Sequence, residues 1–358
     1  MPTLDLTASS VEITRAICDI PSVSGDETSL ADAIEAAVSG HPHLEVIRDG
    51  DTIVARTNLG RDRRVVIAGH IDTVPINDNL PVQNREIDGE PFLWGRGTVD
   101  MKAGVAVQLK LAVELTSPPV DITWMWYDHE EVDSSLNGLG RLARNRPDLF
   151  VGDFAILGEP SNGEVEGGCN GTLRALVRTA GVRAHSARSW IGENAIHKAA
   201  PILTRLAEYR AREIEVEGLV YREGLNAVRI SGGVAGNVIP DACEVEVNYR
   251  FAPSRDAAAA ERVVRDVFTG FDIEIVDVAE GARPGLDAAL ARDFVAAVGA
   301  TPQPKYGWTD VARFSALGIP AVNYGPGDPH LAHHDEERVP LAQIESVERG
   351  LRSWLTGS

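Results

Sequence analysis

The segment RRVVIAGHIDTVP, residues 63–75, decides how this chain is expected to fold. Its apolar run, Val65 to Ala68, has the length and composition of a strand that is buried on both faces of a mostly parallel sheet. His70 and Asp72 follow the run, and alternate side chains of a strand point to the same side. The segment therefore predicts a central strand that ends on a histidine and a carboxylate.

Three further segments place acidic residues at the ends of expected strands or at the start of an expected helix. They are GRGTVDMKAG (95–104), which brings Asp100 to a buried helix over 101–115; DITWMWYDHEE (121–131), a strand that ends on Glu130 and Glu131; and DFAILGEP (153–160), a strand that is followed by Glu159. Ligands of open α/β sheets bind beyond the carboxyl ends of the strands. We therefore expect these carboxylates to meet His70 at one edge of the sheet.

A fifth segment, LAHHDEERV (331–339), adds His333 and His334 near the end of the chain. Zinc binds imidazole nitrogen and carboxylate oxygen, and a pair of metals about 3.5–4 Å apart can act on both oxygens of a displacement reaction. Two histidines and three carboxylates supply two metals if one carboxylate bridges them. The five segments together predict a two-metal hydrolase.

Asp100 has an ordinary alternative role, because aspartate at the start of a helix is commonly an N-cap. The surrounding sequence does not look like an ordinary cap. Gly95, Gly97 and Gly104 leave room for backbone and carboxylate to approach a metal pair closely. We therefore favour Asp100 as the bridging carboxylate.

The other acidic residues divide into several roles. Asp72 is better suited to fixing the ring of a histidine ligand than to binding metal itself. The pair Glu130-Glu131 offers one metal ligand and one general base, which must lie within hydrogen-bond reach of the attacking water. Surface ion pairing is the alternative for this pair, and the apolar run before it argues against exposure of both. The residues alone leave open which of His333 and His334 binds metal.

Length, charge and cysteine content narrow the class of protein. A chain of 358 residues exceeds the roughly 250–300 residues at which one core stops growing, so two domains are expected. The 34 basic and 53 acidic residues give a net charge of −19, which argues against nucleic acid or an anionic membrane as the main partner. The start of the chain does not look like a signal peptide, no apolar run is long enough to span a bilayer, and Cys18, Cys169 and Cys243 form no C-x-x-C pair. These features predict a cytoplasmic protein.

The order of the expected elements indicates an inserted domain. Ser24 to Asp26, in PSVSGDE, can cap the second of two N-terminal helices. Between 171 and 284 the pattern becomes β-α-β-β-α-β, which is typical of a ferredoxin-like domain. The predicted fold is an α/β catalytic domain over 1–170 and 285–358, a mixed and mostly parallel sheet flanked by helices. The α+β lid or dimerisation domain, 171–284, is inserted into it.

Taken together, the motifs resemble the aminoacylase/carboxypeptidase family of di-zinc peptidases, and six separated segments match in order over nearly the whole chain. The stretches from GGCNGTLRALVRTAGVRAHSARSW (167–190) to GWTDVARFSALGIPAVNYGPGDP (307–329) are most similar to the actinobacterial members. Those members remove succinate from N-succinyl-LL-2,6-diaminopimelate in lysine and diaminopimelate biosynthesis. The resemblance thus implies a zinc-peptidase-like amide hydrolase, and the alternative is a related N-acyl-amino-acid deacylase or small-peptide carboxypeptidase.

The resemblance also implies a role for each position of the metal site. The ligands would be His70, Asp100 and Glu159 on one zinc and Asp100, Glu131 and His333 on the other, with Glu130 as the general base and Asp72 orienting His70. His333 is preferred to His334 because the last ligand of the family stands three and four residues before a polar or acidic pair, here Glu336-Glu337. The implied cofactors are two Zn²⁺ ions, and a carboxylate-rich site of this kind also accepts Co²⁺ or Mn²⁺.

The resemblance implies a homodimer that forms through the inserted domain. It also implies that the substrate is a small anionic N-acyl amino acid. His185 would reach the substrate carbonyl in the partner subunit. The substrate carboxylates would lie against Asn237, Arg250 and the segment Trp308-Thr309-Asp310. This last segment replaces a small Gly/Ser-rich stretch of many members, so the pocket wall is expected to differ from theirs.

Overall fold

The computed structural model describes residues 3–357, and the chain packs into two compact units. Residues 3–167, 284–303 and 313–357 form the first unit, and residues 168–283 and 304–312 form the second. The catalytic domain predicted from the sequence included residues 304–312, but these residues pack with the inserted segment. Positions 1, 2 and 358 of the predicted catalytic domain lie outside the described residues.

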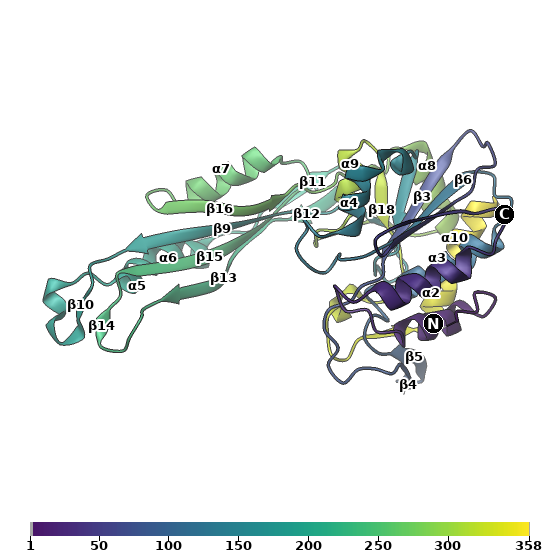
Figure 1. Ribbon diagram of the computed structural model, residues 1–358. Helices are drawn as coiled ribbons and strands as arrows, with labels where there is room; N and C mark the ends of the chain where they lie inside the picture. The colour runs from purple at the N-terminus through teal and green to yellow at the C-terminus, as the bar shows by residue number, and fades with distance from the viewer. Residues whose placement is uncertain (1–2, 358) are drawn as a thin grey trace. The chain divides into compact units, whose positions relative to one another are not determined.

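An eight-stranded sheet forms the centre of the first unit, in the order β1-β2-β6-β3-β7-β18-β8-β17. Its strands are β1 (Glu45–Asp49), β2 (Thr52–Arg56), β3 (Arg64–His70), β6 (Asp121–Tyr127), β7 (Phe154–Leu157), β8 (Glu166–Gly167), β17 (Gln303–Pro304) and β18 (Ala321–Asn323). The four strands β6, β3, β7 and β18 pair in parallel, while β1, β2 and β8 pair antiparallel. The predicted mixed sheet is confirmed, and the segment 63–75 supplies a central strand (Figure 1).

Helices lie on both sides of this sheet (Figure 1). They are α1 (Ser10–Cys18), α2 (Thr28–Val38), α3 (Lys102–Glu114), α4 (Gly138–Asn145), α8 (Ala289–Val298), α9 (Val311–Ala316) and α10 (Leu341–Thr356), with the 3₁₀ turns η1 (Pro147–Phe150) and η3 (Pro329–Leu331). Both α1 and α10 pack against α3, which is buried around its circumference. No helix among residues 3–357 combines the length and the apolar character needed to cross a membrane.

The apolar run of β3 explains the central place of this strand. The residues from Val65 to Ala68 are 0% exposed, so both faces of the strand are covered. Ile67 pairs with Trp124 of β6 on one side and with Ile156 of β7 on the other. This packing holds His70, the last residue of β3, at the carboxyl edge of the sheet.

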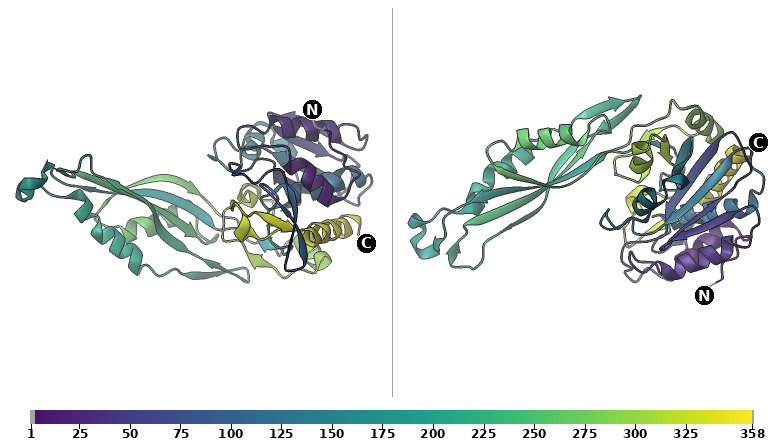
Figure 2. Two further views of the ribbon diagram at one scale, coloured as in Figure 1. Left: turned by 90° about the horizontal axis from the view of Figure 1, so that it is seen from below. Right: turned by 45° about the horizontal axis from the view of Figure 1, so that its top comes forward.

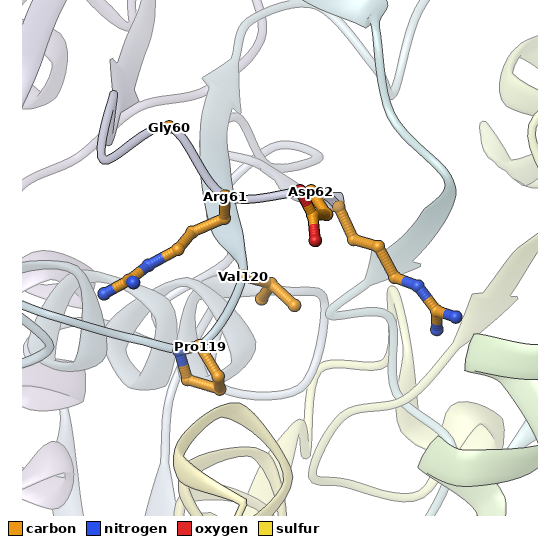
Figure 3. Close-up of a pocket in the computed structure, with 6 residues that line it drawn as sticks. Gly60, Arg61, Asp62, Pro119 and Val120 are labelled. Carbon is orange, nitrogen blue, oxygen red and sulfur yellow. The ribbon is translucent and has the colours of Figure 1, made fainter.

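A surface pocket of about 400 Å³ lies at the opposite, amino-terminal edge of the sheet. Figure 3 shows the loop of Gly60, Arg61 and Asp62 facing Pro119 and Val120, and all of these residues shortly precede β3 or β6. The pocket is therefore separate from the edge at which the candidate metal ligands were predicted.

Asp121, the first residue of β6, organises this amino-terminal edge. Its carboxylate accepts the backbone N–H groups of Leu59 and Arg61 at 2.7 and 2.9 Å. It also accepts the hydroxyl of Thr57 at 2.8 Å. Burial alone would raise the pKa of Asp121, but these donors outweigh it and lower the pKa below the ordinary value.

We expect Asp121→Asn to lower the free energy of unfolding at pH 7 by about 1–3 kcal/mol, because the new amide group turns a donor toward backbone donors. The loss should be complete above the ordinary carboxyl pKa of about 3.9. It should shrink as the pH falls through the lower folded-state pKa, because protonation then removes the advantage of the wild type. Urea denaturation at several pH values measures it, with the exposed neighbour Asp62→Asn as the control. Equal midpoints for the two variants would contradict the expected role.

The second unit contains a four-stranded antiparallel sheet in the order β13-β15-β9-β16. Its main elements are β9 (Gly171–Ala180), α5 (Ala195–Lys198), α6 (Ala200–Glu208), β13 (Gly224–Gly232), β15 (Ala242–Phe251), α7 (Ala257–Val267) and β16 (Asp272–Ala279). The order of elements is β-α-β-β-α-β, so the predicted ferredoxin-like fold is confirmed. Smaller elements are β10 (Ala184–His185), η2 (Ser186–Ile191), β11 (Glu213–Val216), β12 (Leu219–Arg222) and β14 (Val238–Ile239).

The sheet of the second unit is covered on one face. Val245, Val247 and Tyr249 of β15 are fully buried and pack in one core with residues of α5, α6 and α7. The alternate residues Glu244 and Glu246 are only partly buried. Buried and partly buried residues therefore alternate along β15, and Figure 2 shows the helices on one side of the sheet.

Candidate metal centre

His70 stands at the centre of a buried cluster of carboxylates. The ring is 1% exposed, and its Nε2 lies 3.0 Å from Oδ1 of Asp100 and 4.0 Å from Oε1 of Glu159. On the other side of the ring, Nδ1 lies 3.0 Å from the backbone oxygen of Asp72 and 3.4 Å from its carboxylate. One nitrogen therefore faces the candidate ligands, and the other is fixed by Asp72.

Asp72 connects three segments of the first unit. Its side chain is fully buried and accepts the backbone N–H groups of Glu130 and Glu131 at 3.0 and 3.1 Å. It also accepts the hydroxyl of Ser24 at 2.6 Å. The predicted cap of α2 by Ser24 to Asp26 is therefore wrong: α2 begins without a side-chain cap, and Ser24 serves the metal-site loop instead.

Glu130 and Glu131 lie beyond their strand rather than at its end, because β6 stops at Tyr127. The turn that carries them is held by a second buried carboxylate. Glu27 is 0% exposed, and it accepts the backbone N–H groups of His129 at 3.1 Å and of Gly25 at 2.9 Å. Two internal carboxylates, Glu27 and Asp72, thus fix the backbone of this turn.

Asp100 lies in a turn before α3, not in the helix, which begins at Lys102. Its Oδ1 faces His70, and its Oδ2 lies 3.4 Å from Nε2 of His333. One carboxylate therefore stands between two histidines that are far apart in the sequence. This is the position expected of a bridging ligand.

Glu131 and His333 are in direct contact. The two carboxylate oxygens of Glu131 lie 2.9 and 3.0 Å from Nε2 of His333, which has a left-handed backbone with φ of 64°. The ring of the neighbouring His334 has a different task, because its Nδ1 accepts the backbone N–H of Glu336 at 3.0 Å. The geometry therefore favours His333 over His334 as the residue that faces the cluster.

Glu159 follows β7 and is 5% exposed. Its approach to the cluster depends on a close contact between α3 and the preceding loop. A Cβ atom on Gly104 would come within 2.1 Å of the backbone oxygen of Gly158. The glycine of α3 is therefore needed for this packing, in line with the close backbone approach predicted from the sequence.

The chemistry of the cluster fits a metal ion. His70, Asp100 and Glu131 each offer a ligand atom, these atoms all lie within 4.8 Å of one another, and the group could hold a cation. Nitrogen and oxygen ligands in this combination suit zinc and similar divalent ions. Several carboxylates that approach one another in a buried site are stabilised by a cation between them.

The protonation behaviour of the histidines reflects the same demand for positive charge. The carboxylates of Asp100 and Glu131 raise the pKa of His333 to about 10. Burial alone would lower the pKa of His70, but Asp100 and Asp72 raise it well above its ordinary value. Burial raises the pKa of Glu131, whereas the two histidines outweigh burial and lower the pKa of Asp100. A bound divalent cation would replace the protons of the two rings.

The candidate residues of the second unit lie at two ends of its sheet. His185 and Asn237 are exposed at one end: β10 pairs with β14, and the backbone N–H of Ser186 donates to the oxygen of Asn237 at 2.9 Å. Nδ1 of His185 accepts the backbone N–H of Ala187 at 3.1 Å, so the ring orientation is fixed.

Arg250 lies at the other end, near the carboxyl terminus of β15. It is eight residues from Ala242, which begins β15 next to His185 and Asn237, and this separation corresponds to roughly 27 Å along a strand. The structure therefore does not bring Arg250 together with His185 within one chain. Nε of Arg250 donates to Oδ1 of Asn248 at 3.1 Å, and burial lowers the pKa of Arg250.

The segment Trp308-Thr309-Asp310 packs within the second unit. The indole N–H of Trp308 donates to the backbone oxygen of Glu280 at 3.1 Å. Thr309 and Asp310 are buried, and the thiol of Cys169 approaches the backbone oxygen of Thr309 at 3.7 Å. Burial, not activation, raises the pKa of Cys169 to about 11, which agrees with a structural thiol.

The sequence of this chain is similar to those of several known proteins. The description of peptidase family M20/M25/M40 matches residues 66–356. The chain is 54% identical over 357 residues to a protein of Mycobacterium tuberculosis, with 99% of this chain and 100% of the relative covered. That relative is provisionally named a succinyl-diaminopimelate desuccinylase. The succinyl-diaminopimelate desuccinylase of Corynebacterium glutamicum is 47% identical over 366 residues, 99% of this chain and 98% of the relative.

Solved structures show the same fold at low sequence identity. An aminopeptidase of Bacillus cereus aligns with a TM-score of 0.78 and 17% identity, over 99% of this chain and 98% of its own. A Bacillus subtilis protein described as a dinuclear metal-binding peptidase aligns with a TM-score of 0.68 and 16% identity, over 97% and 96% of the two chains. These likenesses concern the fold.

Proposed function

This chain belongs to peptidase family M20/M25/M40, and from that premise we propose that it removes succinate from N-succinyl-LL-2,6-diaminopimelate as a succinyl-diaminopimelate desuccinylase. Two relatives with that name match it from end to end, at 54% and 47% identity. The observation that carries the proposal is the meeting of His70, Asp100 and Glu131 within 4.8 Å at the carboxyl edge of the sheet. Such a cluster can hold the metal that an amide hydrolase of this family uses.

The proposed ligand sets divide the cluster between two metals that share Asp100. His70, Asp100 and Glu159 would hold one ion, and Asp100, Glu131 and His333 would hold the other. The contacts of Asp100 with both histidines support this division. We name zinc as the metal because the ligands are imidazole and carboxylate groups, and the same set would accept Co²⁺ or Mn²⁺.

The proposed mechanism assigns the proton transfers to Glu130. When bound, the metals polarise the amide carbonyl and lower the pKa of water. Glu130 accepts a proton from the attacking water and later donates a proton to the leaving amine nitrogen, so succinate and the free amine are released. Its backbone is fixed by Asp72, because the N–H of Glu130 donates to that carboxylate. Asp72 also keeps the ring of His70 in place.

We further propose that the enzyme is a homodimer in which His185 acts on the substrate of the partner subunit. His185 and Asn237 are exposed and lie beyond the Ala242 end of β15, and Arg250 is roughly 27 Å from Ala242 along this strand, so one chain does not gather them. A two-fold dimer can bring the exposed end of one chain to the site of the other. In this arrangement Arg250 and the segment 308–310 would hold substrate carboxylates, and His185 would stabilise the oxyanion.

Mixing two inactive variants tests the shared site. We expect His185→Ala to impair turnover without loss of metal, since its ring lies outside the metal cluster. In an equal mixture with Glu130→Gln, after subunit exchange, about one quarter of wild-type activity should return, because half the dimers are mixed and each has one intact site. No recovery, although exchange is demonstrated by differently tagged subunits, would mean that His185 does not act on the partner's substrate.

We assign the enzyme to the cytoplasm on the basis of its cysteines. Cys18, Cys169 and Cys243 are all buried and unpaired as disulfides. A protein with only free thiols is suited to a reducing compartment.

The test of the proposed activity is the release of free amine by purified, zinc-reconstituted protein, with and without chelator. The panel contains N-succinyl-LL-2,6-diaminopimelate, several N-acetyl amino acids and dipeptides. Chelator-sensitive turnover of the succinyl compound is expected. Preference for another acyl group or a dipeptide would move the protein to the alternative activities, a deacylase or a carboxypeptidase.

A further inference from the structure

Arg96 and Glu337 form a buried ion pair next to the segments that carry the proposed metal ligands. Nη1 of Arg96 lies 2.8 Å from Oε2 of Glu337, and the two side chains are 4% and 1% exposed. Neither residue belongs to the proposed ligand set. A buried pair of opposite charges is weak evidence for stability as such, so its contacts must explain what it does.

Glu337 holds the turn that carries Asp100. Its Oε1 accepts the backbone N–H groups of Val99 at 2.8 Å and of Asp100 at 3.1 Å. The position of Glu337 is set by a small antiparallel sheet of β4 (Gln83–Ile87), β5 (Glu90–Trp94) and β19 (Arg338–Pro340). The ladder continues past β5, because the N–H of Gly95 donates to the backbone oxygen of Glu337 at 3.0 Å.

Arg96 reaches the two other segments that carry ligands. Its Nε donates to the backbone oxygen of Pro75, in the loop that follows His70, at 3.2 Å. Its Nη1 also approaches the backbone oxygen of His334, next to His333, at 3.4 Å. The guanidinium group of Arg96 thus contacts both the loop that follows His70 and the turn that contains His333. Arg96 itself belongs to the turn that carries Asp100.

We propose that Arg96 and Glu337 form a clamp that sets the spacing of Asp100 between His70 and His333, and so determines how tightly the metal pair is bound. This inference rests on the proposed metal centre and adds two positioning residues that lie outside the proposed ligand set. Removing a group that holds a metal ligand in place commonly lowers the metal affinity by about 10- to 100-fold.

The chain supplies a matched control one residue away. Glu336 also pairs with an arginine, since its Oε2 lies 2.9 Å from Nη1 of Arg85, but this pair is exposed, at 55% and 34% of the side chains. Exposed ion pairs contribute little. Glu336→Gln therefore makes the same chemical change beside the same histidine loop without touching the clamp.

The experiment is a zinc titration of metal-free wild type, Glu337→Gln and Glu336→Gln against a competing chromophoric chelator. We expect Glu337→Gln to bind zinc about 10- to 100-fold more weakly and Glu336→Gln to stay within about twofold of the wild type. Circular dichroism and thermal unfolding of the metal-free proteins show whether each variant is folded. If Glu337→Gln does not fold, Arg96→Lys, which keeps the charge but not the fork of donors, should show the same weakening.

The outcomes separate the inference from the proposed function. Folded Glu337→Gln and Arg96→Lys that bind zinc as tightly as Glu336→Gln would overturn the clamp and leave the metal centre intact. A wild type that binds no zinc would overturn the metal centre, and the clamp with it. In the double variant Arg96→Lys/Glu337→Gln, the loss of zinc affinity should be smaller than the product of the two single fold-losses, because residues in direct contact are not additive; a full product would contradict a joint clamp.

Discussion

Replacing Glu130 by glutamine should lower kcat by about 10²- to 10⁴-fold, which is the usual contribution of a positioned general acid–base group. Glutamine has the same shape but cannot accept a proton from water or return one to the amine. Its backbone N–H still donates to Asp72, so the turn that carries it should be preserved. Zinc content is therefore expected to stay near that of the wild type, and steady-state kinetics with metal analysis measure both quantities.

Asp133→Asn is the matched control for this change, because Asp133 is an exposed acidic residue of the same loop. It should leave kcat near the wild-type value. Wild-type turnover by Glu130→Gln would remove Glu130 from the mechanism. Loss of zinc together with activity would instead identify it as a metal ligand.

The second large effect is expected at Asp100. Asp100→Asn should weaken zinc binding at both positions and abolish measurable turnover, because an amide is neutral and cannot bridge two cations as a carboxylate does. The two histidines that face Asp100 lose their common partner as well. Zinc titration and turnover at saturating zinc report the two losses separately.

Glu131→Gln serves as a comparison within the same cluster. Of the two histidines, Glu131 contacts only His333 at hydrogen-bond distance. The variant should therefore weaken zinc binding at one metal position more than at the other. If Asp100→Asn also lost only one zinc ion per chain, Asp100 would not be the bridge.

Much of the candidate metal centre could be predicted from the sequence because its signals are local. The apolar runs before His70 and before Glu130 each predict a buried strand. Polar residues that follow such a strand must then lie at the carboxyl edge of the sheet. The alternation of apolar and polar residues along β15 likewise indicates a sheet with one covered face. These features depend on residues that are close together in the chain.

The parts that could not be predicted depend on contacts between distant residues. Ser24 looked like a helix cap but donates to Asp72, 48 positions away. Glu337 accepts the N–H of Val99 across 238 positions, and nothing in EERV distinguishes it from the exposed Glu336. The placement of residues 304–312 was missed for the same reason, since packing decides which unit a loop joins. The Gly-rich GRGTVD pattern signalled a crowded turn, but not the clamp of Arg96 and Glu337.

The most direct test of the central claim is to restore zinc stepwise to metal-free protein while turnover of N-succinyl-LL-2,6-diaminopimelate is followed. We expect turnover to be absent without metal, to rise with bound zinc, and to reach its maximum at two ions per chain, as a carboxylate shared between two metal sites requires. Turnover that persists in the metal-free protein, or a folded protein that binds no zinc, would contradict this expectation.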